Sequence, residues 1–258
     1  FNIGAEGQLL AGALAGTWLG LNVSWPLLAR VPAMLVVSAV AGGLWAWIPA
    51  WLRARGNVNE IITSLLLTFV AIDIQNYLLR GPMQSDQGNF PQTELFSQAA
   101  TIPDVYNGVH AGIVIAVVFA VLTHLLMTKT RLGFAITFVG SNDEAARQAG
   151  ISKYRAYVLV FLVGGVFAGV AGISEIAGAQ GRFRAAYAPG YGFTAIPIAL
   201  LGRNSALKVV LAAVFFAVLF VGGAGMEVRL SVPFAITEII QALVILFLIT
   251  AEFFKRYH

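Results

Sequence analysis

The chain has 258 residues, of which 59% are hydrophobic and 11% are charged, and its mean hydropathy is +0.81. Soluble domains carry about 25% charged residues, so the composition excludes a soluble domain and indicates an integral membrane protein. The sequence contains no cysteine, which excludes disulfide bonds and sites that use cysteine as a metal ligand or nucleophile.

The net charge of +4 comes from short basic clusters that flank apolar segments. Positive residues at such places set the orientation of a membrane protein. We therefore expect contact with membrane lipid and none with nucleic acid.

Apolar stretches along the chain predict the membrane spans, because a helix needs roughly 20 mostly apolar residues to cross a bilayer. The candidates are 9–23, 31–52, 60–79, 111–127, 156–174, 206–222 and 232–254. The stretch 192–202 is too short for a full span. The sequence thus predicts an all-α fold, a polytopic bundle of transmembrane helices.

The charges of the loops predict the orientation. Basic residues outnumber acidic ones in 128–155, whereas 80–110 holds Arg80 and three acidic residues. The positive-inside rule places the first loop in the cytoplasm and the second outside. The basic C-terminus then lies inside only if 192–202 also crosses the membrane.

We expect 192–202 to be a half-length or broken helix. Pro189, Gly190 and Gly192 precede it and Pro197 lies within it. Irregular backbone at membrane depth is tolerated where it is buried or lines a wet cavity, and broken helices often line a transport path. An interfacial helix followed by an ordinary loop is the alternative.

Regularly spaced glycines predict close helix packing. Gly12, Gly16 and Gly20 share one face of the first span, and Gly165 and Gly169 share one face of the fifth. Small residues at this spacing let neighbouring backbones approach. They predict a tightly packed bundle and carry no information on function.

A charged segment, 134–157, lies between two strongly apolar stretches. Within it we expect a two-turn helix at 143–149, capped by Ser141 or Asn142 and ended by a left-handed Gly150. The small Ala145 and Ala146 leave room for a partner surface to pack close, and Arg147 and Gln148 could hydrogen-bond across the interface. A solvated helix without a partner is the alternative; the entropy lost in ordering a polar loop favours the partner.

Several motifs together carry a family resemblance. They are NIGAEGQ at 2–8, NVNEIITSLLL at 57–67, YLLRGPM at 77–83, EAA at 144–146 followed by Gly150, and GYGFTAIPIALLGRN at 190–204. In this order they resemble the permease subunits of nucleoside and simple-sugar ABC importers, which are related to ribose and branched-chain amino acid permeases. The resemblance covers essentially the whole chain.

The resemblance implies one transmembrane permease domain, 1–258, with further helices upstream, in a bacterial inner membrane. Its cytoplasmic loop 128–155 would carry the coupling helix that docks on an ATPase subunit. The implied coupling residues are Asn142, Asp143, Glu144, Ala145, Ala146, Arg147 and Gly150. The implied partners are a second permease, ABC ATPase subunits and a periplasmic or lipid-anchored solute-binding protein. The form of NIGAEGQ resembles the larger member of heterodimeric pairs, with a homodimer as the alternative.

Polar residues within the spans are the candidates for the solute pathway, because ionisable groups there normally face a cavity or a partner. The predicted pathway residues are Asn2, Glu6, Gln8, Thr68, Asp73, Asn76, Tyr191, Phe193 and Thr194. Asn2, Glu6 and Gln8 rest on the resemblance, whereas Thr68 and Thr194 stand where the family pattern has Asn and Asp. Asp73 shares a helix face with Asn76, but contact with headgroup water is an equal alternative for it.

The aromatic rings of Tyr191 and Phe193 could stack on a base or a sugar, or serve as interface anchors. Glu238 in the last span has Gln241 on the same face. For this carboxylate we expect a structural role, paired with Arg229 or accepting backbone N–H bonds.

No enzyme site is expected in this chain. It contains no G-x-x-x-x-G-K-[ST] motif, so we expect no cofactor here and place ATP and Mg on partner ATPase subunits. His110, His124 and His258 are too scattered for a metal site or a triad, and no catalytic residue is assigned.

The sequence thus predicts an ABC importer permease for a nucleoside. A pentose, an inositol-like polyol or another small heterocycle is the next candidate solute. An ATPase-independent transporter or facilitator is the main rival. An intramembrane enzyme would lack a convergent nucleophile and base.

Overall fold

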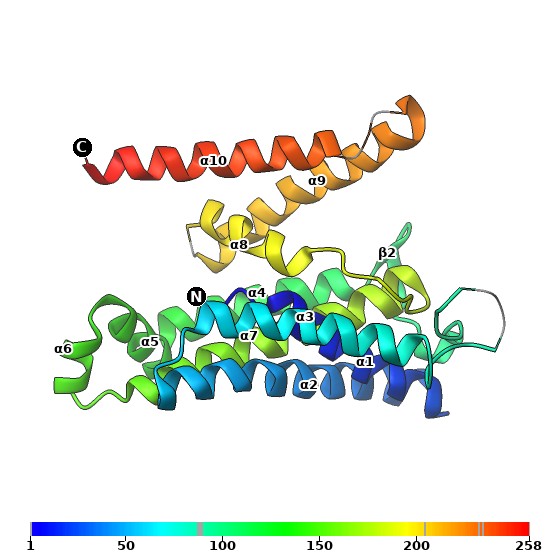
Figure 1. Ribbon diagram of the computed structural model, residues 1–258, viewed down its shortest axis with the longest axis horizontal. Helices are drawn as coiled ribbons and strands as arrows, with labels where there is room; N and C mark the ends of the chain where they lie inside the picture. The colour runs from blue at the N-terminus through cyan, green and yellow to red at the C-terminus, as the bar shows by residue number, and fades with distance from the viewer. Residues whose placement is uncertain (1, 87–89, 204, 232, 234, 258) are drawn as a thin grey trace. The chain divides into compact units, whose positions relative to one another are not determined.

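The computed structural model describes residues 2–86, 90–203, 205–231, 233 and 235–257, without the side chains of Asp143, Ile245, Leu248, Ile249 and 251–257. The chain forms two compact units, Phe1–Phe193 and Thr194–His258. The first holds α1 (Ala5–Asn22), α2 (Leu27–Gly56), α3 (Glu60–Leu79), a 3-10 turn η1 (Gln98–Ala100), the hairpin β1 (Asp104–Tyr106) and β2 (Val109–His110), α4 (Gly112–Lys129), α5 (Arg131–Ser141), α6 (Asp143–Gln148), α7 (Lys153–Glu175) and a π-helix η2 (Ile176–Gln180) (Figure 1). The boundary falls inside α8 (Tyr191–Leu201), and the second unit continues with α9 (Ala206–Leu230) and α10 (Ala235–Tyr257).

Among the described residues, five helices are long and apolar enough to cross a membrane. They are α2, α3, α4, α7 with η2 (Lys153–Gln180) and α9. They confirm the predicted all-α, multi-pass architecture. The short apolar helix expected at 192–202 is α8, with Pro197 inside it.

The first predicted span was drawn too short. It was expected at 9–23, but α1 begins at Ala5 and is not among the candidate spans found in the described residues. The structure buries Glu6 and Gln8, which are 0% and 1% exposed. Hydrogen bonds inside the protein make this burial possible, and a hydropathy argument cannot foresee them.

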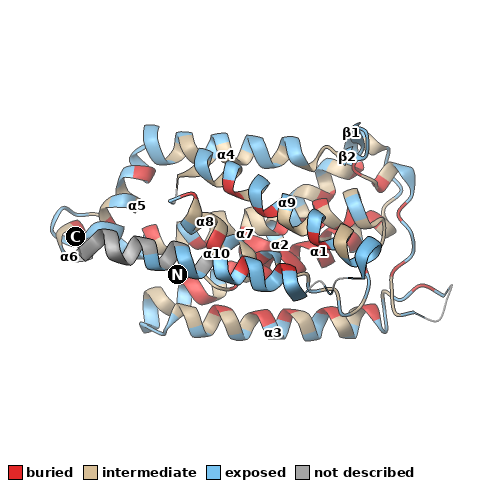
Figure 2. Cartoon of the chain, turned by 90° about the horizontal axis from the view of Figure 1, so that it is seen from above, coloured by how far each residue is buried: buried red, intermediate tan, exposed pale blue. Residues whose placement is uncertain are grey.

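Helices α1, α2 and α7 pack against one another around the core of the first unit, and Figure 2 shows the buried residues gathered on them. A Cβ added at Gly12 would overlap the backbone of Gly169, and one added at Gly165 would overlap the backbone of Gly42. These contacts confirm the close packing predicted from the glycine spacing. Gly42, on α2, was not foreseen as part of it.

The predicted single cytoplasmic helix is wrong in one respect, because two helices lie between α4 and α7. Helix α5 precedes the expected one, and the Thr130 hydroxyl caps it by accepting a hydrogen bond from the amide of Gly133 at 3.1 Å. Gly133 allows the turn, since a Cβ there would overlap the backbone of α4 at Leu126 and Met127. Helix α5 was not predicted, because its residues are mostly apolar or small and only its first one, Arg131, is charged.

Candidate functional site

Helix α6 is the expected two-turn helix, and its ends are built as predicted. The Oδ1 atom of Asn142 accepts hydrogen bonds from the amides of Glu144 at 3.1 Å and Ala145 at 3.0 Å. Of the two expected caps, Asn142 is therefore the one used. Gly150 has φ of +75°, the left-handed stop that glycine adopts without strain.

The two faces of α6 have different surroundings. Ala146 is fully buried in a small cluster with Val139 of α5 and Ala156 of α7. Its side chain therefore faces α5 and α7. On the outer face, the guanidinium of Arg147 binds the carboxylate of Glu144 through two hydrogen bonds, one of them 3.1 Å long. Both side chains are exposed; the side chain of Asp143 lies outside the described residues.

The start of α1 is held by a pair of amide side chains. Asn2 Nδ2 donates to Gln8 Oε1 at 3.0 Å, and Gln8 Nε2 donates back to Asn2 Oδ1 at 3.1 Å. The amide of Ile3 donates to the hydroxyl of Ser64 on α3 at 3.2 Å. Hydrogen bonds of the NIGAEGQ segment thus connect Asn2 with Gln8 of α1 and connect the start of the segment with α3.

Glu6 lies at the centre of this arrangement. Its Oε1 atom accepts from the amide of Gly190 at 2.9 Å, and its Oε2 atom accepts from the amide of Gly192 at 2.7 Å. A Cβ at Gly192 would overlap the backbone of Glu6. The carboxylate therefore caps the N-terminus of α8, where a negative charge is favourable.

Helix α3 presents a buried stripe on one face. Its members are Ser64, Thr68, Ala71, Gln75 and Leu79. The hydroxyl of Thr68 donates to the carbonyl of Ser64 at 3.1 Å. Asp73 is exposed, so it does not share the surroundings of the half-buried Asn76.

The C-terminal half of α3 supports the chain that leads into α8. Asn76 Oδ1 accepts from the amide of Ala186 at 2.7 Å, and Gln75 Nε2 donates to the carbonyl of Arg184 at 3.3 Å. Sequence reasoning missed Gln75. Its spacing from Ser64, Thr68 and Ala71, in steps of four, three and four, is the signal that would have found it.

The same segment also pairs with the loop that follows α3. The amide of Thr93 donates to the carbonyl of Phe183 at 2.8 Å, and the amide of Ala185 donates to the carbonyl of Pro91 at 2.9 Å. Phe183 is fully buried. Hydrogen bonds to α3 and to the loop after it therefore hold the irregular chain between η2 and α8 in place.

A second polar cluster, which sequence reasoning missed, lies where α7 widens into η2. Glu175 Oε1 accepts from Gln180 Nε2 at 3.0 Å and from the hydroxyl of Tyr187 at 3.2 Å. Burial and the nearby Glu175 carboxylate raise the pKa of Tyr187 above its ordinary value, so the phenol remains a hydrogen-bond donor. Glu175 lay one residue beyond the predicted span 156–174 and was not considered.

The remaining predicted pathway residues lie around α8. Tyr191 and Phe193 are 41% and 38% exposed. Thr194 is half-buried and belongs to the second unit. The structure thus leaves both aromatic rings accessible in the first unit.

Glu238 is exposed on α10 in the second unit. Within the part of the chain that the structure describes, it forms no ion pair with Arg229. The buried polar side chains of α10 are Thr237 and Gln241 instead, and Thr237 packs where a side chain at Gly223 of α9 would otherwise lie.

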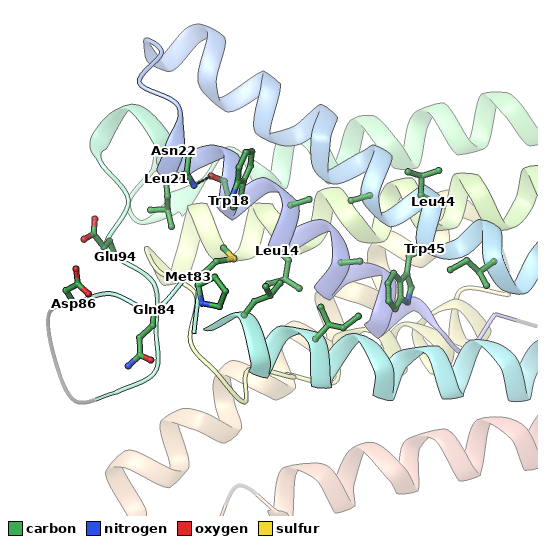
Figure 3. Close-up of a pocket in the computed structure, with 17 residues that line it drawn as sticks. Leu14, Trp18, Leu21, Asn22, Leu44, Trp45, Met83, Gln84, Asp86 and Glu94 are labelled. Carbon is green, nitrogen blue, oxygen red and sulfur yellow. Dashed lines mark hydrogen bonds between the residues drawn. The ribbon is translucent and has the colours of Figure 1, made fainter. Parts of the chain in front are cut away.

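A cavity of about 750 Å³ opens between α1, α2, α3 and the segment after α3 (Figure 3). Most of its wall is apolar, with the indole rings of Trp18 and Trp45 along it. Its polar lining residues are Asn22, Gln84, Asp86 and Glu94, which Figure 3 shows at one end.

The comparisons with known proteins agree on one family. The family model described as "Branched-chain amino acid transport system / permease component" matches residues 1–249. The chain is 66% identical to the glucose ABC transporter permease protein TsgB13 of Haloferax volcanii, across 100% of this chain and 71% of that protein. It is 34% identical to the guanosine ABC transporter permease protein NupP of Bacillus subtilis, across 96% of this chain and 72% of that protein. The guanosine ABC transporter permease protein NupQ of the same organism is 23% identical, across 83% and 70%. No solved structure matches the chain.

Proposed function

The chain belongs to the branched-chain amino acid transport system permease family, and on that premise we propose that it carries a simple sugar or a nucleoside across the cytoplasmic membrane at the expense of ATP. The family assignment confirms the resemblance found in the sequence, and the chain is a permease subunit of an ABC importer. The solute, the energy source and the partners are proposals.

A simple sugar is the first candidate. The relative named for glucose is 66% identical over the whole chain, whereas the one named for guanosine is 34% identical. This difference reverses the order expected from the sequence, in which a nucleoside came first. Both solutes carry a hydroxylated ring, so the proposed substrate class is a neutral ring compound with several hydroxyl groups.

Helix α6 is the observation that carries the proposed ATP coupling. Its outer face presents the Glu144–Arg147 pair, and its inner face places Ala146 against α5 and α7. Helix α7 in turn packs on α1 and α2 through glycines. A partner that moves α6 would therefore displace helices of the transmembrane core, since close-packed interiors transmit strain.

The proposed partners follow from this arrangement. ATPase subunits carrying ATP and Mg would dock on α6 from the cytoplasm. A second permease would complete the pathway, and the similarity of the chain to both NupP and NupQ of one organism supports a heterodimer. A solute-binding protein would deliver the solute on the outer side.

The pathway residues remain proposals. Glu6 and the Asn2–Gln8 pair would act by holding the start of α8, because all three residues are engaged in hydrogen bonds. Tyr191 and Phe193 would contact the solute, since their rings are exposed. Thr68, Asp73, Asn76 and Thr194 would line or support the path.

Uptake by cells that produce the complete transporter tests the proposal. Radiolabelled glucose and guanosine are supplied separately, with and without a variant of the ATPase subunit that cannot hydrolyse ATP. We expect uptake of at least one solute that the ATPase variant abolishes. Uptake that survives the loss of ATPase activity would instead support the rival, an ATPase-independent transporter.

A further inference from the structure

We infer that Glu175, Tyr187 and Gln180 form a site that recognises hydroxyl groups of the solute at the external part of its path. The site lies in the first unit, on the last turn of α7, on η2 and on the chain that leads into α8. The inference rests on the proposed function and adds to it a place where the solute is recognised.

The carboxylate of Glu175 has an unused acceptor. Both donors within reach, Gln180 Nε2 and the Tyr187 hydroxyl, bind its Oε1 atom. In the described part of the chain, Oε2 receives no hydrogen bond and no Lys or Arg pairs with the group. An ionisable group without a counter-charge in a membrane-spanning helix is costly and normally serves a pathway or a ligand.

The two donors have spare acceptors as well. The Tyr187 hydroxyl donates its hydrogen bond to Glu175 and keeps lone pairs that accept another, and Gln180 keeps its carbonyl oxygen. The free positions of the cluster are thus mainly acceptors around one negative charge. Such a site binds neutral molecules that donate several O–H bonds, and it repels anions such as phosphorylated sugars.

The cluster is both accessible and fixed in place. Glu175, Gln180 and Tyr187 are each half-buried rather than buried, so a solute can reach them. The ring of Tyr187 packs edge-on against Phe183, with ring centroids 6.0 Å apart, and Phe183 is fully buried. A preformed geometry lowers the entropy cost of binding.

The conformation of the backbone around the cluster also supports a binding site. Residues 176–180 form a π-helix, which is rare and often occurs at functional sites. The chain then runs past Tyr187 to Tyr191, whose exposed ring begins α8. A hydroxylated ring bound at Glu175 would therefore meet an aromatic face at the next step toward α8.

The inference is tested by transport kinetics of the complete transporter with Glu175→Gln. The wild type and the variant are compared on the transported sugar and on analogues that each lack one hydroxyl group. In the wild type we expect one analogue to show a KM raised about 10-fold to 100-fold, as for loss of a hydrogen bond to a charged group. Glu175→Gln should raise the KM of the parent sugar by a similar factor and remove the discrimination against that analogue.

Two further variants keep the test decisive. Glu238→Gln changes an exposed carboxylate of α10 and should leave the discrimination intact. If Glu175→Gln fails to assemble, Tyr187→Phe carries the same test, because it removes one hydroxyl from the cluster. Discrimination that persists in the variants would overturn the inference and leave Glu175 with a structural role. Wild-type uptake of neither sugar nor nucleoside would overturn the proposed function itself, which is a distinguishable result.

Discussion

The carboxylate of Glu6 accepts a hydrogen bond of 2.7 Å from the amide of Gly192, although the two residues are 186 positions apart in the sequence. The other carboxylate oxygen binds the amide of Gly190. The beginning of α1 and the beginning of α8 are therefore joined by one buried side chain. Gly192 cannot be replaced by a larger residue without a clash, because it has no space for a Cβ atom. Glu6 is needed because its two carboxylate oxygens each accept one of these hydrogen bonds.

Replacing Glu6 with alanine should destabilise the protein. The change removes the acceptor that the amides of Gly190 and Gly192 use, and a buried donor left unsatisfied, such as the amide of Gly192, costs about 1–3 kcal/mol. We expect a clearly lower thermal midpoint of the purified transporter and loss of uptake. Glu227→Gln, at an exposed carboxylate of α9, serves as the control and should melt like the wild type. Equal midpoints for Glu6→Ala and the control would contradict the capping role.

Replacing Gly169 with alanine should prevent close packing of α7. A Cβ there would overlap the carbonyl of Ser38 on α2, and overpacking of this kind costs about 1–3 kcal/mol. Gly222→Ala is the matched control, since a Cβ at Gly222 meets no atom within 4 Å. It should be neutral or stabilising, because alanine favours a helix over glycine by roughly 1 kcal/mol. Comparison of thermal midpoints checks this, and a similar effect of both substitutions would refute the packing argument.

Charge reversals on α6 should separate its internal pairing from its contact with a partner. Glu144→Arg should reduce co-purification of the ATPase subunit and solute-stimulated ATP hydrolysis. The double variant with Glu144→Arg and Arg147→Glu restores an ion pair within α6 but reverses the pattern that faces outward. We expect it to remain defective; full recovery would mean that only the internal pair matters. Such an exposed pair contributes about 0.2–1 kcal/mol, too little to explain a lost complex.

The matched control for α6 is Lys129→Glu, which reverses an exposed charge at the end of α4 on the same predicted side of the membrane. It should leave ATPase binding unchanged. A loss of binding in this variant would indicate a general effect of cytoplasmic charge.

Asn76→Leu should loosen the chain that leads into α8. Asn76 Oδ1 is the acceptor for the amide of Ala186, and leucine of similar size cannot replace it. Hydrogen exchange measured by mass spectrometry should show faster exchange at 183–190, while α1 and α7 stay protected. Asp73→Asn, one turn away and exposed, should show no such change.

The sequence alone was sufficient for the features that depend on local composition. Apolar length predicted five of the membrane helices, glycine spacing predicted close helix packing, and Asn142 and Gly150 predicted the ends of α6. Each of these follows from residues that lie close together in the chain. The motifs predicted the family in the same way.

The features that the sequence did not predict depend on partners far away in the chain. The helical start of α1 depends on Gly190 and Gly192, which satisfy the Glu6 carboxylate. The inward face of Ala146 depends on α5, which was not expected. The Glu175 cluster depends on Tyr187, 12 positions away across an irregular segment. Side-chain hydrogen bonds of this kind have no periodic pattern, so inspection of one span at a time could not reveal them.

The backbone contacts among α1, α2 and α7 restrict where motion can occur during transport. Helices whose backbones touch at glycines, as at Gly12 with Gly169 and Gly42 with Gly165, cannot slide past one another without a clash. This group of three should therefore move as one rigid body. Helix α4, all of whose residues are described, buries no side chain. Whatever alternation opens the path to one side and then the other should therefore move this group as a unit against the elements outside it.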